Sequence, residues 1–332
     1  MKKSPQSDQE VLPGIRSYQK ERDLAVSRQV DRVMEIWKAG LSGDRLYTAV
    51  MMVICGLPVR DTRSMEPVVR KAQLGDKSWI RVTYSRKSDQ VPLPYGADRT
   101  MVYFLTNKAV LQQSHILQWE HANEYMHLFG MDVDSGKNYR DVQERFFRVA
   151  YMRIMVEYLD QENQVVETWD CPLIDHSRMP ARVDGEGNWK PRYSVSKMLD
   201  IDQTISFGYR FFSELKKTPV PIPLELILAA DKKYRVMDYM LFLYWRCFAA
   251  SSQSFIPWRY LQLQFDAADT NDRRWVQQFK LAYSILKSLP DPTNQIRVEI
   301  SSAGLTIYPL PIGTAFFEGH GKLGYRKLKN ED

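Results

Sequence analysis

The sequence has 332 residues, of which 44% are hydrophobic, so the chain can bury two cores of ordinary size and is not a disordered polymer. Its 46 basic and 40 acidic residues give a net charge of +6, which permits an anionic partner such as nucleic acid without establishing one. Three cysteines, at positions 55, 171 and 247, exclude a disulfide framework and a zinc spacing, and predict reduced thiols in a cytoplasmic protein.

The first part of the chain has no targeting or membrane pattern. The lysines at positions 2 and 3 are not followed by an apolar run, so we expect no secretory signal, and residues 1–22 are polar enough to predict a disordered tail. Apolar residues at helical spacing predict a helix over 24–37. The longest apolar run, residues 46–59, contains Gly56 and Pro58 and is too short to cross a bilayer, so we expect it in the core.

Strand and helix patterns then follow one another. Ile80, Val82 and Tyr84 alternate with polar neighbours and predict a strand over 78–84. The other predictions in chain order are a rigid turn over 91–96, a helix over 101–113, a short strand over 115–119, a helix over 120–129, a long helix over 139–159 and a strand over 164–169. Residues 184–187 read Asp-Gly-Glu-Gly, a turn that closes a long hairpin over 169–198 or marks a linker; we favour the hairpin.

The second half contains a helix, a turn and a longer helix. These are predicted over 259–265, 266–269 and 271–289, the outline of a helix-turn-helix. An apolar stripe at helical spacing runs along the longer helix, formed by Trp275, Phe279, Ala282, Leu286 and Leu289. Downstream, apolar residues alternate on both sides of a Ser-Ser-Ala-Gly turn at 301–304, which predicts a hairpin that would form a wing.

An internal repeat connects the two halves. VPLPY (91–95), MVYFL (101–105) and FRVAY (147–151) recur in the same order as VPIPL (220–224), MLFLY (240–244) and FKLAY (279–283). The last word of each set precedes a predicted pair of strands. A repeat of this kind predicts two copies of one structural unit, so the predicted fold class is α+β with two tandem winged-helix domains.

The predicted domains follow from this repeat. They are a disordered tail over 1–22, an N-terminal winged-helix domain with extra elements over 23–204, a C-terminal winged-helix DNA-binding domain over 205–315 and a flexible basic tail over 316–332.

Several segments resemble the plasmid-encoded RepA family of replication initiators. They are LPYGADRTMVYFLTNKAV (93–110), FFSELKKTPVPIPLELILAADKK (211–233), MDYMLFLYWRC, IPWRYLQLQF, FKLAYSILKSLP and IRVEISSAGLTIYPLP. The resemblance covers about residues 90–312 and is most specific in the C-terminal half, whereas residues 1–75 show none. Asp266 departs from the family, in which a glycine is expected to end the first helix of the motif, so we expect that turn to differ.

The resemblance implies a function that the residue patterns do not establish. It implies an initiator that binds directly repeated sites in the double-stranded DNA of a plasmid origin and recruits the host initiator and the replicative helicase. It also implies repression of the protein's own promoter as a homodimer. A membrane partner is not expected.

Candidate DNA contacts lie mainly on the polar side of the 271–289 helix. Arg and Lys reach phosphates and guanine edges, and Gln reaches adenine, but a basic solvated face of an ordinary helix is the alternative. Trp275 is interpreted as core. Arg297 on the wing is either a backbone or minor-groove contact or an ordinary exposed residue. The predicted DNA-binding residues are Arg273, Arg274, Gln277, Lys280, Arg297, Lys137, Arg140 and Arg148.

The three candidates of the first half share their helix side with acidic residues. Asp141 and Glu144 lie on the same side as Lys137, Arg140 and Arg148 and would repel phosphates.

Patterns typical of an enzyme are weak. His115, His121 and His127 are spaced by six residues, which does not place them on one helix face, and neither a zinc-protease signature nor a His-x-His pair for a nicking enzyme occurs. The glycines at 319, 321 and 324 lack the spacing of a phosphate loop. We therefore expect no catalytic residue, metal or cofactor, and retain two alternatives to the initiator: a winged-helix repressor and a DNA-nicking or priming enzyme.

Overall fold

The computed structural model describes residues 45–74, 78–119, 121–160, 165–177, 181–187, 189–191, 204–265, 272–289 and 295–310. The two predicted tails, the helix over 24–37 and the turn over 266–269, with Asp266, lie outside these residues. Helices and antiparallel sheets occur together in the described part. The fold is α+β, as predicted.

The first half contains a unit with the order helix, strand, helix, helix, hairpin. Its elements are α3 (Asp98–Gln112), β4 (Ile116–Gln118), α4 (Ala122–Leu128), α5 (Gly136–Ala150), β5 (Met152–Asp160) and β6 (Val165–Pro172). The two strands of the hairpin pair from Arg153↔Pro172 to Asp160↔Val165. This is a helix-turn-helix followed by a wing.

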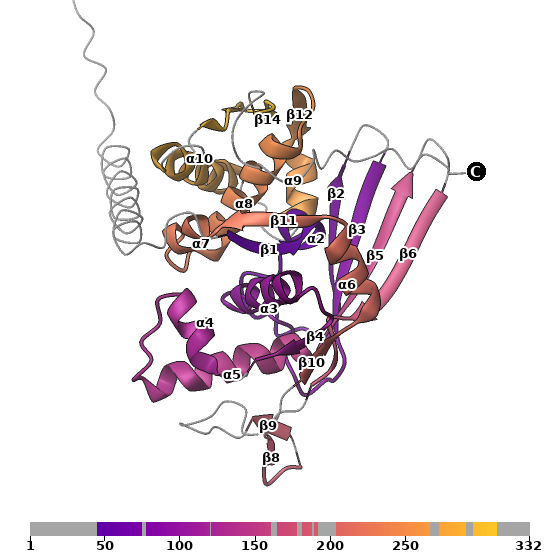
Figure 1. Ribbon diagram of the computed structural model, residues 1–332. Helices are drawn as coiled ribbons and strands as arrows, with labels where there is room; N and C mark the ends of the chain where they lie inside the picture. The colour runs from indigo at the N-terminus through magenta and orange to yellow at the C-terminus, as the bar shows by residue number, and fades with distance from the viewer. Residues whose placement is uncertain are drawn as a thin grey trace, which may run out of the picture.

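The second half repeats this order. Its elements are α8 (Tyr234–Ala249), β12 (Ser254–Pro257), α9 (Trp258–Phe265), α10 (Asp272–Ser288), β13 (Val298–Ile300) and β14 (Gly304–Ile307). The predicted hairpin is confirmed, and β12 adds to it as a third strand that the sequence did not indicate. Figure 1 shows α8, α9 and α10 on one side of the central strands β1 and β11, and α3, α4 and α5 on the other.

The first helix of each unit is central and surrounded by the core. Residues 101–105 of α3 and residues 240–244 of α8 are all buried, as expected for helices that pack on every side. These two segments of the repeat therefore lie in the same helix of each unit. The third pair of segments lies at different positions, because residues 147–151 are at the end of α5 and residues 279–283 are inside α10.

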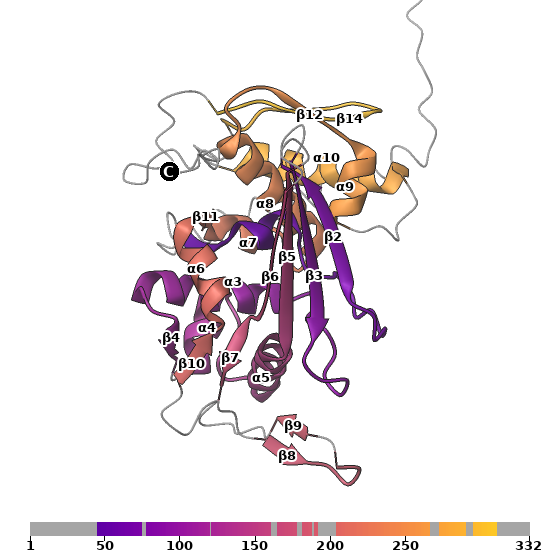
Figure 2. The ribbon, with the colours of Figure 1, turned by 90° about the vertical axis from the view of Figure 1, so that its right-hand side faces the viewer.

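Strands β2 (Val68–Gln73) and β3 (Ser78–Arg86) extend the first wing into a four-stranded sheet of order β2-β3-β5-β6. Ile80, Val82 and Tyr84 are buried, as their alternation predicts. Figure 2 shows these long strands running from the level of α5 to that of α9. The ring of Trp79 in β3 meets the ring of Tyr260 in α9 edge to face, with centroids 5.0 Å apart, so the sheet that contains the first wing touches the second unit.

The described residues also form several shorter elements. They are β1 (Arg45–Ala49), α2 (Val50–Ile54), β7 (Ile174–His176), β8 (Ala181–Val183), β9 (Trp189–Pro191), β10 (Thr204–Phe207), α6 (Tyr209–Lys217), β11 (Pro219–Pro223) and α7 (Leu224–Ala229). β1 pairs with β11, and β10 pairs with both β4 and β7. The predicted boundary at 204/205 lies at the start of β10, a strand that belongs to the sheet of the first half, and the domain division stays a prediction.

Two local predictions can be compared directly with the structure. The helix predicted over 139–159 is wrong beyond Ala150: β5 begins at Met152, with Met152, Ile154 and Val156 buried and Arg153 exposed in strand alternation. The turn at residues 184–187 does close a hairpin, formed by β8 and β9, with Gly187 at a φ of 83° that suits glycine. β6 and β7, however, do not continue that hairpin.

Candidate nucleic-acid interface

The apolar side of α10 is packed as predicted. Trp275, Phe279, Ala282, Leu286 and Leu289 are all at most 2% exposed. Phe279 stacks on Tyr239 of α8 with ring centroids 3.9 Å apart, and aromatic contacts of this kind add to the burial of apolar area. Trp275 is therefore a core residue, and the position of α10 on α8 is set by its aromatic side chains.

The opposite side of α10 holds the main predicted contacts. Lys280 is exposed and Gln277 is half-buried, so the structure presents the amine of Lys280 to solvent. Arg273 and Arg274 belong to the first turn of α10, but their side chains lie outside the described part of the structure. The start of a recognition helix is the part that contacts base edges in helix-turn-helix proteins.

Arg297 lies next to the wing, and its side chain interacts with Glu299 and Tyr308. Its side chain is 66% exposed, its Nη2 atom lies 3.3 Å from Glu299 Oε1, and its guanidinium lies 4.1 Å from the ring centroid of Tyr308. An exposed ion pair of this kind contributes little to stability. The guanidinium is reachable from solvent and lies over an aromatic ring.

Helix α5 presents two of its predicted cations to solvent. Lys137 and Arg140 are exposed, whereas Asp141 and Glu144 are half-buried. The face that carries these residues is thus a mixed one, with two cations near the start of the helix and two carboxylates further along.

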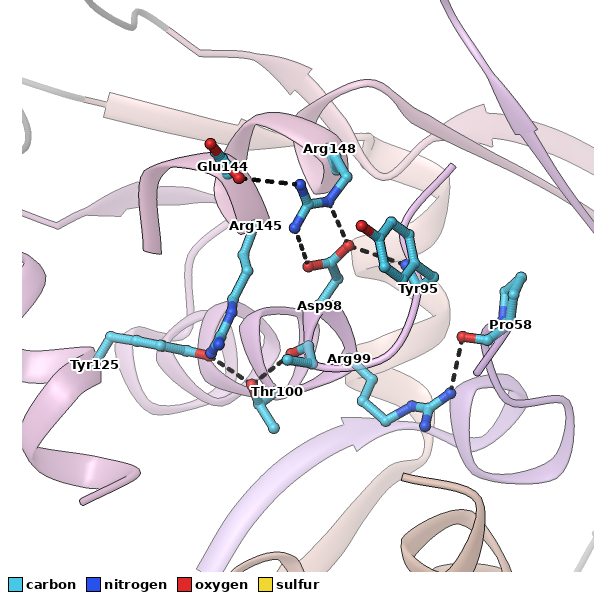
Figure 3. A network of polar contacts seen from close by, with 10 residues as sticks. Pro58, Tyr95, Asp98, Arg99, Thr100, Tyr125, Glu144, Arg145 and Arg148 are labelled. Carbon is cyan, nitrogen blue, oxygen red and sulfur yellow. Dashed lines mark hydrogen bonds and ion pairs between the residues drawn. The ribbon is translucent and has the colours of Figure 1, made fainter. Parts of the chain in front are cut away.

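Arg148 lies in a different environment from the other candidates. Its Nε atom lies 2.7 Å from Asp98 Oδ2 and its Nη2 atom 2.8 Å from Asp98 Oδ1, while Asp98 itself is 1% exposed. The guanidinium also lies over the ring of Tyr95 at 5.1 Å. Figure 3 shows this two-bond ion pair, which joins α5 to the start of α3. Arg148 thus holds two helices of the first unit together.

Other buried polar contacts surround this ion pair. Arg145 donates to the hydroxyl of Tyr125 at 2.9 Å, and the Tyr125 hydroxyl also meets Thr100 Oγ1 (Figure 3). On the far side of α3, Arg99 is 1% exposed, donates to the carbonyl of Leu57 at 2.6 Å and lies 3.2 Å from Asp238 of α8. Asp98 and Arg99 are neighbours in sequence, so α3 is tied to both units through adjacent residues.

The comparisons with known proteins concern the fold. No protein-family model matches the chain, and no curated protein matches it. Among solved structures, the chain is similar to a selenomethionine derivative of domains 2 and 3 of RctB, with a TM-score of 0.49 and 10% identity over 80% of this chain and 94% of that chain. A second structure of RctB domains 2–3 gives a TM-score of 0.43 and 10% identity over 77% and 94% of the two chains. At this level of similarity the function of this protein has to be argued from its own residues.

The described residues contain neither a metal-binding cluster nor a membrane-spanning helix. No group of three or more His, Cys, Asp or Glu side chains in this part of the chain is placed to hold a metal ion. None of its helices combines the length and the apolar character needed to cross a bilayer. The described cysteines, Cys55, Cys171 and Cys247, are buried and not disulfide-bonded, and burial raises the pKa of Cys55 to about 12.

Proposed function

We propose that this protein is a replication initiator that binds directly repeated duplex DNA at an origin through its two winged-helix units. The proposal includes a plasmid origin, recruitment of the host initiator and replicative helicase, and repression of its own promoter as a homodimer, all of which rest on the resemblance to the RepA family. The protein acts by binding, without catalysis and without a cofactor.

The observation that carries the proposal is the recurrence of one element order in both halves, with exposed cations on the second motif helix of each. These are Lys280 on α10 and Lys137 and Arg140 on α5. Cations on such helices are suited to phosphates and to base edges in the major groove. Two reading helices in one chain also suit direct repeats, because a monomer needs no two-fold symmetry in its site.

A binding titration tests this proposal. Fluorescence anisotropy with a duplex that carries the tandem repeats beside the gene should give tighter binding than a scrambled duplex of equal composition. Affinity should fall by about a thousandfold between 50 and 200 mM salt if roughly six phosphates are neutralised. Lys280→Gln should weaken binding, whereas Lys216→Gln, a matched change at an exposed lysine of α6, should not. Equal affinity for both duplexes would refute the proposal.

Two further assays separate the alternatives. A plasmid that carries the repeats should be maintained only in cells that supply the protein, which a repressor without a replication role would not achieve. Supercoiled plasmid incubated with the protein and Mg²⁺ should stay supercoiled, whereas a nicking enzyme would relax it.

A further inference from the structure

A cavity of about 730 Å³ lies between the start of α8, helix α10 and the segment that follows α2. Its lining contains one acidic residue, Asp61, and five basic residues, so its formal charge is +4. The basic residues are Arg60, Arg70, Lys232, Lys233 and Arg235. They come from segments far apart in the sequence, and charges of one sign gathered in a concave site concentrate ions of the opposite sign.

Arg70 of β2 forms part of the inner wall. It is 7% exposed, and its Nε atom is buried without a hydrogen-bond partner among the described residues. The nearest buried carboxylate, that of Asp238, already lies 3.2 Å from Arg99 and also interacts with Arg70 and Arg235. One carboxylate thus faces three guanidinium groups, and an excess of positive charge remains beside the cavity.

The start of α8 adds backbone donors to the same cavity. Tyr234, Arg235 and Val236 line it and form the first turn of this 16-residue helix, whose N-cap residue Lys233 makes no side-chain capping hydrogen bond. The first N–H groups of a helix have no partner within the helix, and the helix dipole favours an anion there.

The loop before α8 has an unusual backbone at Asp231 and Lys232. Lys232 has a φ of 62° and Asp231 a φ of 42°, a left-handed conformation that residues other than glycine rarely adopt. This conformation places Lys232 and Lys233, both exposed, at the rim of the cavity.

We propose that this cavity binds a phosphoryl group, carried either by a free phosphate compound or by the DNA backbone. A buried arginine donor, the N-terminus of a helix and a rim of lysines are the features that recognise phosphate oxygens, and the volume exceeds that of a single inorganic phosphate. Because Gln278 and Leu281 of α10 also line the cavity, a bound phosphate would lie against the helix assigned to DNA reading. Only the DNA-backbone source rests on the proposed function.

Calorimetric titration of the full chain with inorganic tripolyphosphate at 150 mM KCl tests the proposal without DNA. The wild type should bind one equivalent, and the double variant Lys232→Gln/Lys233→Gln should bind at least tenfold more weakly. The matched control is Lys216→Gln/Lys217→Gln, an adjacent pair of exposed lysines on α6 outside the cavity. Because all four lysines are exposed, both variants should melt like the wild type.

A second arm with duplex DNA identifies the source of the phosphate. If the wild type binds tripolyphosphate and Lys232→Gln/Lys233→Gln loses it while keeping its DNA affinity, the ligand is a free phosphate compound. If this variant instead loses tenfold or more in DNA affinity, with a smaller salt slope than the control, the ligand is the backbone. The proposal is overturned if the cavity variant and the control behave alike in both arms. If the protein binds no DNA at all, the proposed function is refuted. The tripolyphosphate titration alone then decides whether the cavity binds a phosphoryl group.

Discussion

Asp98 and Arg148 form a two-bond ion pair between the start of α3 and the last turn of α5, with the carboxylate 1% exposed and the arginine side chain 15% exposed. A partly buried pair of this kind is costly to break on one side, because the remaining buried charge is left without an opposite charge.

Arg148→Met should therefore lower the free energy of unfolding by about 3–5 kcal/mol. Asp98→Asn/Arg148→Met should recover part of the loss, because the buried charge is removed as well. Arg140→Gln, on the exposed side of the same helix, should change stability by less than about 0.5 kcal/mol. Urea denaturation of the three variants measures this, and equal midpoints for Arg148→Met and Arg140→Gln would contradict the role given to the pair.

The two sides of α10 should respond differently to substitution. Phe279→Ala removes a ring that is fully buried against Tyr239 and should cost about 3–5 kcal/mol of stability. Lys280→Gln, one residue further along, should leave the melting temperature unchanged and weaken DNA binding. Thermal melts and anisotropy on the same samples compare them, and loss of stability in Lys280→Gln would show that its side chain supports the fold.

The buried carboxylate of Asp238 should make stability depend on pH. Burial raises its pKa from 3.8 to about 6, although Arg99, Arg70 and Arg235 lower it. A pKa raised on folding means that the native state binds a proton more tightly than the unfolded state, so the stabilising contribution is complete below pH 3.8 and is lost as pH rises through 6. A pKa shift of this size corresponds to a change of about 3 kcal/mol in the free energy of unfolding.

Asp238→Asn isolates this contribution from that of the other carboxylates. The difference in unfolding free energy between wild type and Asp238→Asn should fall as the pH is raised from 4 to 7, measured by urea denaturation at each pH. A difference that stays constant or rises over this range would mean that the pairing with Arg99 outweighs burial.

Gly304 should tolerate no side chain. A Cβ atom there would lie 2.2 Å from the carbonyl oxygen of Ile256, in the neighbouring strand β12. Gly304→Ala should therefore displace the wing and lower stability by about 1–3 kcal/mol. Gly185→Ala is the matched control, since nothing lies within 4 Å of a Cβ atom at that position. Calorimetric melting temperatures compare the two, and equal values would indicate that the wing strands separate readily.

Two reading helices should produce a long footprint on DNA. Hydroxyl-radical protection by the wild type should extend over about two helical turns, with centres about 10 base pairs apart. Lys137→Gln/Arg140→Gln should shorten protection to the turn contacted by α10, because it neutralises the two exposed cations of α5. A wild-type footprint confined to one turn would mean that the first unit does not contact DNA.

The sequence predicts correctly those elements whose buried side is marked by a local pattern of apolar residues. The alternation of Ile80, Val82 and Tyr84 and the stripe through Trp275 and Phe279 report which side of an element is buried, and the structure agrees. The sequence pattern does not separate β5 from α5, because the strand follows the helix almost without a break and pairs with β3 and β6 on its two sides. Neighbours of that kind override local preference.

The candidate site was predictable only in part. The exposure of Lys137, Arg140 and Lys280 follows from helical spacing, but the position of Arg148 does not, because its partner Asp98 lies 50 residues earlier. The basic cavity could not be anticipated for the same reason, since residues near 60, 70 and 233 meet only in the folded chain.

The pairing of β1 with β11 has a consequence for biosynthesis. Arg45 lies opposite Pro223, 178 residues later in the chain. Most of the nascent chain must therefore emerge from the ribosome before β1 can pair with β11. Until then the edge of β1 is open to pairing with other nascent chains, which favours aggregation. The need for chaperones during synthesis should therefore be highest before residue 223 emerges. Substitutions that weaken the two-stranded sheet of β1 and β11 should reduce the soluble yield more than they reduce the stability of the folded protein.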